Sequence, residues 1–306
     1  MLREVFYWIM NMSIIASVYG LLIYFLRYIR SLPRTAVYLL WAVVLFRMLC
    51  PVGFSSEYSL MNIMSGLADR AIVRTVPVEE LSLSLSNTIQ AASTYAPVTY
   101  KTDALEGFFR ITSILWIIPA LAAILAVMVL YGITVSELRR ATPLYDNIYE
   151  GDIVNTPAVA GILRPRIILP AGTVQEELEY VLLHERVHLR RGDNLWRMIA
   201  IIAVCIHWFN PLSWIFLRIF LNDCELACDE TAVKQLHKEE RKEYAHALLK
   251  YAAAEPSVFS SAFGSSRVRV RIGRILSYRR LTWFSAVCFG MLGIAVAYLL
   301  LTNGMA

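Results

Sequence analysis

The sequence Val181-Leu-Leu-His-Glu-Arg-Val-His188 decides how the central part of the chain folds. His184 and His188 lie four residues apart, so on a helix both imidazoles leave the same face and can bind one metal ion. Glu185 lies beside them and can take a proton from a zinc-bound water, whose pKa the metal lowers to about 7. The alternative is a polar helix face with two solvated histidines. The pattern favours a helix that carries a zinc site.

Cap and turn signals bracket this motif helix. Thr173-Val-Gln-Glu176 is a capping box that predicts a helix start, and Gly192 predicts the helix end. Upstream, residues 158–170 contain two short apolar segments around an Arg-Pro turn, which favours two edge-like strands. Downstream, residues 223–254 favour further helix, ended by Pro256. We therefore expect a small sheet followed by helices.

A catalytic zinc needs a third protein ligand and an open fourth position. The outstanding candidates lie in Asn222-Asp-Cys-Glu-Leu-Ala-Cys-Asp-Glu230. Glu225 and Asp229 share a helix face, so one can bind the metal while the other orients a ligand imidazole. We assign Glu225 as the ligand and Asp229 as the orienting residue. Two alternatives stay open: an acid-rich helix start that interacts with the helix dipole, or Cys224 and Cys228 as ligands of a closed structural site.

Composition separates the chain from soluble proteins. Of 306 residues, 58% are hydrophobic and only 17% are charged, and the mean hydropathy is +0.54. A soluble protein of this size cannot bury that much apolar surface in one core. The same numbers exclude a disordered chain, a collagen and a disulfide-rich scaffold. The net charge of +5 is too small to indicate nucleic acid as a direct partner. An integral membrane protein with a water-facing part remains.

Four apolar runs predict membrane-spanning helices. Three of them carry no charge and are long enough to cross about 30 Å of hydrocarbon: Val5 to Leu26, Ile111 to Val135, and Leu281 to Ala306. The fourth run, Thr35 to Phe54, contains Arg47, whose side chain we expect to extend to the membrane interface. The basic residues Arg27, Arg30 and Arg34 follow the first run instead of preceding it as in a signal peptide, and no small-residue cleavage site is evident, so we expect a retained helix.

Residues 198–217 form a fifth uncharged run with a different character. His207-Trp-Phe-Asn-Pro211 lies at its centre, and Asn-Pro breaks a helix whose freed backbone groups need partners. We expect two short helices that enter the membrane from one side and return, as a re-entrant hairpin.

Positive charge in short loops predicts the orientation. Residues 27–34 hold three arginines without an acid, and residues 267–280 hold six arginines without an acid. Both segments are therefore expected at the cytoplasmic face of the plasma membrane, which places the N-terminus and the C-terminus outside. We attribute the arginines of 267–280 to this anchoring, with binding of anionic lipid as the alternative.

The resulting organisation has five parts, each assigned from hydropathy and charge. They are two transmembrane helices in 1–54, an extracytoplasmic loop at 55–110, a third transmembrane helix at 111–135, a cytoplasmic domain at 136–280 that carries the expected zinc motif and includes the hairpin 198–217, and a final transmembrane helix at 281–306.

The chain resembles the integral membrane zinc metallopeptidases of the BlaR/MecR antirepressor type. The matching stretches are Gly161 to Pro170, Val181 to Asp193, His207 to Trp214 and Glu225 to Asp229, and with the apolar runs they cover nearly the whole chain. The resemblance implies a mostly α membrane protein with a gluzincin-like α+β cytoplasmic domain and one zinc per chain. It also supports the ligand set His184, His188 and Glu225, the catalytic base Glu185 and the orienting residue Asp229.

The same resemblance implies a role in signalling. Signalling members of the family respond to a stimulus outside the cell and cause cleavage of a cytoplasmic DNA-binding repressor, often after self-cleavage. A helix-turn-helix repressor is therefore an expected substrate, membrane lipid is an expected contact, and a homodimer is a candidate assembly. We expect residues 256–266, of which five of eleven are serine, to form a mobile loop. Within it Ser260, Ser261, Ala262 and Phe263 mark a self-cleavage region, with an ordinary linker as the alternative.

Peptide hydrolysis also needs a group that stabilises the oxyanion. Tyr244, His246 and Tyr251 are candidates, but such residues more often belong to an ordinary helix face, and we assign none of them this role. An extended substrate could add as a strand beside residues 158–168.

One departure from the family bears on function. The β-lactam-sensing members carry a penicillin-binding sensor domain after the last span, whereas this sequence ends at Ala306. Antibiotic sensing is therefore not carried over, unless the sequence is a piece of a longer protein. Two other functions stay open. A membrane quality-control protease would have many substrates, and in a non-proteolytic zinc-stabilised scaffold Glu185→Gln would leave function intact.

Overall fold

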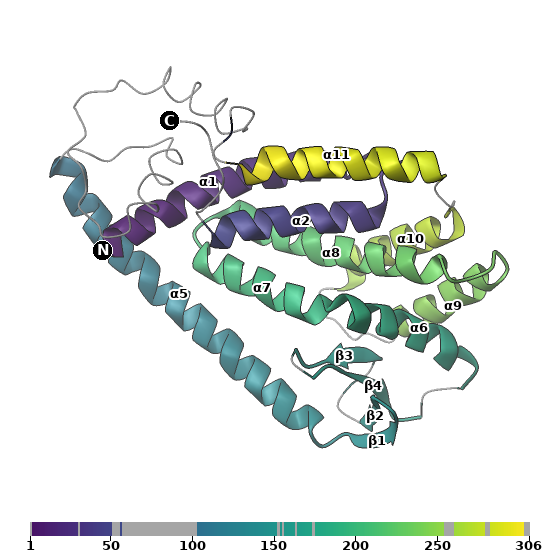
Figure 1. The fold of residues 1–306 in the computed structure, drawn as a ribbon. Coiled ribbons are helices and arrows are strands. Elements are labelled where there is room, and N and C mark those ends of the chain that lie inside the picture. The colour runs from purple at the N-terminus through teal and green to yellow at the C-terminus, as the bar shows by residue number, and fades with distance from the viewer. Residues whose placement is uncertain are drawn as a thin grey trace.

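The computed structural model is mostly helical, with one small sheet at one end (Figure 1). It describes residues 2–29, 31–50, 56, 103–151, 154, 156–162, 164–172, 175–253, 260–278 and 282–302. Most of the expected extracytoplasmic loop and the first two residues of the expected capping box therefore lie outside the described residues.

Three described helices are long and apolar enough to cross a membrane. They are parts of α1 (Leu2–Leu26), α5 (Asp103–Leu138, with Pro119 inside it) and α11 (Trp283–Leu301). These helices coincide with the three uncharged runs of the sequence. Because α5 begins at Asp103, it extends beyond the expected span on both sides.

The expected second span is shorter than its apolar run. α2 (Arg34–Leu49) has 16 residues, which corresponds to about 24 Å of helix. Cys50 is already extended, with φ −127° and ψ 116°, because the following Pro51 disfavours the helical conformation of the residue before it. α2 is therefore not among the described helices long enough to span a membrane.

Arg47 does not reach the surface, so the expectation that it extends to the interface is wrong. Its side chain is fully buried and its Nε donates to the carbonyl oxygen of Leu300 at 2.8 Å. That carbonyl lies in the last turn of α11, where backbone oxygens have no partner within the helix. α2 is packed against α1, α8 and α11, which leaves the guanidinium an internal partner instead of a route to water.

The apolar run 198–217 is broken where Asn-Pro predicts a break. α7 (Asp193–Ile206) and α8 (Pro211–Val233) form a helical hairpin, and the Asn210 side chain caps α8 by accepting from the Leu212 N–H. The Asn210 amide also donates to the hydroxyls of Ser13 and Ser17 on α1. His207 bonds the Met48 carbonyl through Nε2 at 2.8 Å. Asn210 and the Nε2 atom of His207 thus find partners inside the protein, whereas the buried His207 Nδ1 has none among the described residues.

The second half of α8 joins the apolar helices to the rest of the chain. Asp223 is fully buried and accepts hydrogen bonds from Arg27 at 2.9 Å and from the indole of Trp41 at 3.0 Å. Phe216 and Phe220, on the preceding turns, lie in the same core as α1 and α2. One helix therefore spans both regions of the molecule.

The second part of the serine-rich segment is helical, not a loop. α9 (Glu240–Ala253) is followed by α10 (Ser260–Leu276), so a mobile loop is wrong for residues 260–266. Serine is a moderate helix former, and the arginine-rich residues that follow pack against α8 and α9 and extend the helix. Residues 254–259 lie outside the described residues, and the side chains of 260–263 do too.

The sheet has four short strands in the order β1-β2-β4-β3. The two expected strands are β3 (Ala158–Ala160) and β4 (Arg166–Pro170), which pair antiparallel. β1 (Thr142–Tyr145) and β2 (Ile148–Gly151) form an antiparallel hairpin, and β2 pairs parallel to β4. The strands β3 and β4 pack against α6 (Gln175–Arg191), the motif helix.

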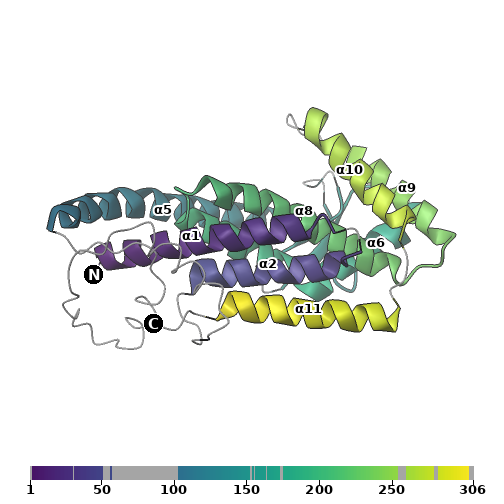
Figure 2. The same ribbon diagram turned by 90° about the horizontal axis from the view of Figure 1, so that it is seen from above.

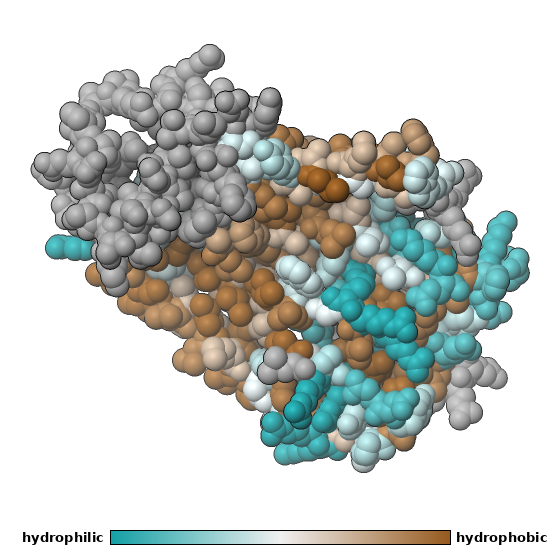
Figure 3. Space-filling model, viewed as in Figure 1, coloured by the Kyte–Doolittle hydropathy of each residue, from teal (hydrophilic) through white to brown (hydrophobic). Residues whose placement is uncertain are grey.

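The helices α1, α2, α7, α8 and α11 run side by side, and the sheet, α9 and α10 lie at one end of them (Figures 1 and 2). Hydrophobic residues cover the face over α5 and the neighbouring helices, whereas hydrophilic residues gather over the sheet, α9 and α10 (Figure 3). This division is typical of a protein with one part in a membrane and one part in water.

Candidate metal centre

The motif histidines lie on one buried face of α6. His184 and His188 are each 5% exposed, and their Nε2 atoms face each other at 3.1 Å. α6 begins by Gln175 and ends at Arg191, because Gly192 adopts φ 64°, a left-handed conformation that ends a helix readily at glycine. Val181, Leu182 and Val187 are buried on the same helix and fix its packing. The spacing of four residues has placed both imidazoles together.

Glu225 approaches the two imidazoles from α8. Its Oε2 lies 3.5 Å from the His184 Nε2, and its Oε1 lies 3.6 Å from the His188 Nε2. Donor atoms about 2.0–2.2 Å from a tetrahedral zinc lie about 3.3–3.5 Å apart. The two nitrogens and the carboxylate therefore have the chemistry and the spacing of a three-ligand zinc site.

Each imidazole has a partner on its other nitrogen. His188 Nδ1 lies 2.6 Å from Asp193 Oδ2. His184 Nδ1 lies 2.9 Å from the Tyr244 hydroxyl and 3.3 Å from Asp229 Oδ1, and Tyr244 in turn donates to Asp229. We assign the proton of each ring to Nδ1, which leaves both Nε2 lone pairs directed at the shared position.

Two arginines neutralise the acids of the centre. Arg271, on α10, binds Asp229 with two hydrogen bonds of 2.7 and 2.9 Å and lies 3.4 Å from Glu225 Oε2. Arg197, on α7, donates to Glu225 Oε1. Burial raises the pKa of Asp229, but the charge and hydrogen bonds of Arg271 outweigh this effect and hold the pKa well below its usual range. The attribution of Arg271 to membrane anchoring is therefore wrong.

Glu185 is buried beside the two histidines in sequence, at 8% exposure. Burial raises the pKa of its carboxyl, against the opposing influence of His184 and His188. A raised pKa makes this carboxylate a stronger base, which is the direction that a general base requires.

The cysteines form an alternative donor set. Ligand atoms of His184, His188 and Cys228 lie close enough to hold a metal, as do those of His188, Asp193 and Cys224. However, the Cys228 sulfur lies 3.6 Å from the His184 Nδ1 and 3.4 Å from the His184 carbonyl oxygen. The Glu225 set uses both Nε2 atoms as they stand, so it fits the geometry better.

The sequence did not predict a role at the centre for Asp193, Arg197 or Arg271. Asp193 directly follows Gly192, the glycine that ends α6. The turn at Gly192 brings the Asp193 side chain back beside His188. Tyr244 was one of three candidates, and the His246 side chain among them is exposed. Arg197 and Arg271 come from other helices, and no local pattern marks them.

Two carbonyl oxygens in and just after β3 have a side-chain partner on α7 that the sequence did not predict. The Asn194 amide donates to the carbonyls of Val159 at 2.8 Å and Gly161 at 3.1 Å. A substrate strand beside β3, as expected from sequence, would therefore have to replace these two hydrogen bonds.

The sequence matches the BlaR1 peptidase M56 family over residues 7–273. It is 33% identical over 101 residues to the methicillin resistance mecR1 protein of Staphylococcus aureus, covering 32% of this chain and 17% of that protein. It is 29% identical over 136 residues to the regulatory protein BlaR1 of Bacillus licheniformis, covering 42% of this chain and 23% of that protein. Each match thus spans less than a quarter of the relative's length.

Proposed function

The chain belongs to the BlaR1 peptidase M56 family, and on that premise we propose that it is a membrane-embedded zinc endopeptidase that hydrolyses peptide bonds at the cytoplasmic side. The observation that carries this proposal is the convergence of His184, His188 and Glu225 at mutual distances of 3.1–3.6 Å. The proposal includes a gluzincin-like fold for residues 136–280, with one zinc per chain.

The proposed mechanism assigns one task to each side chain. His184, His188 and Glu225 hold the zinc, which supplies polarisation of the scissile carbonyl and acidification of a water. Glu185 takes the proton of the attacking water and then gives it to the leaving amine. Asp229, with Tyr244, holds the His184 ring so that Nε2 faces the metal.

The proposed topology places the N-terminus and the C-terminus outside and the metal centre in the cytoplasm, in a multi-pass plasma-membrane protein. Three helices long enough to cross a membrane support the membrane location. The hydrophilic surface over the sheet, α9 and α10 supports a water-facing site (Figure 3). The same proposal takes the apolar run Thr35 to Phe54, which includes most of α2 and is longer than this helix, as a second span, and it takes the α7–α8 hairpin as a re-entrant element.

We further propose a regulatory substrate. The names of the relatives, a methicillin resistance protein and a regulatory protein, support a role in signalling. A cytoplasmic helix-turn-helix repressor is the proposed substrate, and a second proposed cleavage lies in the chain itself, at Ser260 to Phe263. A homodimer and contact with membrane lipid belong to the same proposal, without direct binding to nucleic acid.

Metal content and hydrolysis together test the proposal. Detergent-purified full chain should hold about one zinc, Glu225→Ala should lose it, and Glu185→Gln should keep zinc but lose hydrolysis of a labelled unfolded protein by about 100-fold or more. Glu179→Gln is the matched control, because Glu179 is exposed on the same helix. Zinc absent from folded wild type, or hydrolysis retained by Glu185→Gln, would overturn the proposal.

A repressor and a general substrate pool can then be separated. Glu185→Gln should retain bound substrates, which cross-linking and mass spectrometry identify. A single repressor among the captured proteins supports signalling, and many unrelated membrane proteins would instead indicate quality control.

A further inference from the structure

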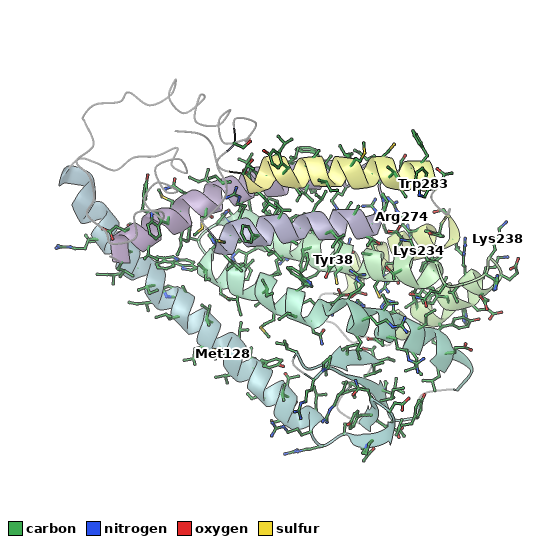
Figure 4. The ribbon with its side chains drawn as sticks, viewed as in Figure 1. Tyr38, Met128, Lys234, Lys238, Arg274 and Trp283 are labelled. Carbon is green, nitrogen blue, oxygen red and sulfur yellow. The ribbon has the colours of Figure 1, made fainter. Side chains whose placement is uncertain are left out.

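One hydrogen-bond chain links the apolar helix α2 to a ligand of the metal centre. The Tyr38 hydroxyl donates to Asp193 Oδ1 at 2.8 Å, and Asp193 Oδ2 lies 2.6 Å from the His188 Nδ1. Tyr38 lies on the part of α2 that faces α7, where Asp193 begins the helix (Figure 4). All three side chains are buried, and Asp193 is fully buried.

The Asp193 carboxylate is the acceptor at the centre of this hydrogen-bond chain. Both neighbours of Asp193 are donors, and each binds a different oxygen of the same carboxylate. An asparagine could donate its amide to the Tyr38 hydroxyl, but it would offer the His188 Nδ1–H a neutral oxygen in place of a charged one, which makes a weaker hydrogen bond. A helix-start acid that interacts only with the helix dipole needs no such pair of donors.

Tyr38 itself is held from two sides. Its ring stacks on Phe220 of α8, with centroids 5.8 Å apart and planes 15° apart. The guanidinium of Arg191, from the last turn of α6, lies over the same ring at 4.2 Å and 3.4 Å from Asp193 Oδ1. The hydroxyl therefore has little freedom to leave Asp193.

We propose that Asp193 is a positioning residue for His188 and that Tyr38, acting through Asp193, makes α2 part of the metal centre. This inference rests on the proposed zinc site. It adds that one ligand is oriented from an apolar helix, so that the affinity for zinc depends on how α2 lies against α6 and α7.

Zinc affinity of the detergent-purified full chain tests the inference without any need for hydrolysis. Competition with a chelator should show about 10–100-fold weaker binding for Asp193→Asn and about 5-fold weaker binding for Tyr38→Phe, which removes one hydrogen bond and keeps the stacked ring. The visible spectrum of the cobalt-loaded protein should change in both variants, because the imidazole orientation changes. In the Asp193→Asn background, Tyr38→Phe should add little.

Tyr19→Phe is the matched control. Tyr19 is a fully buried tyrosine of α1, and its hydroxyl has no hydrogen-bond partner among the described residues. Its variant should bind zinc and cobalt as wild type does. A loss equal to that of Tyr38→Phe would mean that any buried hydroxyl matters, and the specific chain would be wrong.

The outcomes distinguish this inference from the proposed function. Wild type without zinc overturns both. Zinc in wild type with unchanged affinity and spectrum in Asp193→Asn overturns only the positioning role, and full additivity of the two substitutions overturns the route through Asp193. If Asp193→Asn does not fold, Tyr38→Phe alone decides, since it removes a single oxygen atom.

Discussion

Asp229 is the acceptor on which the His184 side of the metal centre depends. It takes one hydrogen bond from Tyr244 and two from Arg271, and it is 2% exposed. Burying a charged pair is costly, and it is tolerated only when each group is fully bonded. The carboxylate therefore has two tasks, to orient an imidazole and to neutralise a buried guanidinium.

Asp229→Asn should weaken both tasks at once. We expect zinc binding to fall by about 10–100-fold and the free energy of unfolding without zinc to fall by up to about 3 kcal/mol, because Arg271 loses its closest charge. Thermal unfolding and chelator competition measure the two effects. Asp146→Asn is the control, since Asp146 is an exposed turn residue with φ 47°, a conformation that asparagine also adopts. Equal stability of the two variants would contradict this account.

At the residue scale, sequence could predict the parts of the centre that local spacing fixes. His184 and His188 meet because four residues make one helical turn, and Glu225 and Asp229 share a face for the same reason. Tyr38 and Arg271 could not be predicted, because their contacts join segments far apart in the chain. The arginine-rich segment also suggested a simpler role at the membrane, which Arg271 does not have.

Among the elements, α1 and α8 approach each other closely at Gly20. A Cβ atom on Gly20 would lie 2.2 Å from the ring of Phe216, which no real contact allows. Small residues permit this kind of close helix approach between apolar helices. The glycine is therefore a packing requirement.

Gly20→Ala should destabilise the protein although alanine favours helices. Overpacking costs about 1–3 kcal/mol, whereas the propensity gain is about 1 kcal/mol, so the melting temperature should fall. Gly132→Ala on α5 is the matched control, because a Cβ there meets nothing within 4 Å. A fall in the control alone, or in both equally, would contradict the packing argument.

Asn210→Ala should loosen the start of α8. It removes a helix cap worth about 1 kcal/mol and the hydrogen bonds to Ser13 and Ser17, so thermal unfolding in detergent should begin earlier. Thr282→Ala removes the cap of α11, whose hydrogen bond to the Ser285 N–H is exposed, and should have a smaller effect. The reverse order of the two variants would argue against the role given to Asn210.

Element prediction succeeded where one signal was strong. The apolar runs gave α1, α5 and α11, and Asn-Pro gave the break between α7 and α8. β1 and β2 were missed because β1 is exposed along its whole length, so it shows no alternation of apolar and polar residues. The start of α10 was missed because serine-rich composition resembles a loop, whereas the packing of its later residues decided for helix.

Taken as a whole, the molecule should depend on zinc for part of its stability. A metal that binds the folded state at 100 times its dissociation constant contributes about 2.7 kcal/mol. Chelation should therefore lower the melting temperature of wild type and abolish hydrolysis, and added zinc should restore both. Glu225→Ala should melt at the same temperature with and without zinc. A zinc-dependent shift in that variant would move the ligand assignment to Cys228.

Asp193 and Asp223 set a lower limit on the size of a working fragment. Asp223 receives its donors from Arg27 and Trp41, and Asp193 receives one from Tyr38, so both carboxylates are completed by α1, α2 and the turn between them. A truncation that began at α5 would strand two buried acids. Each would cost several kcal/mol, comparable to the whole stability of a typical domain. The hydrophilic half of this protein is therefore expected to need α2 and the turn that precedes it in order to fold.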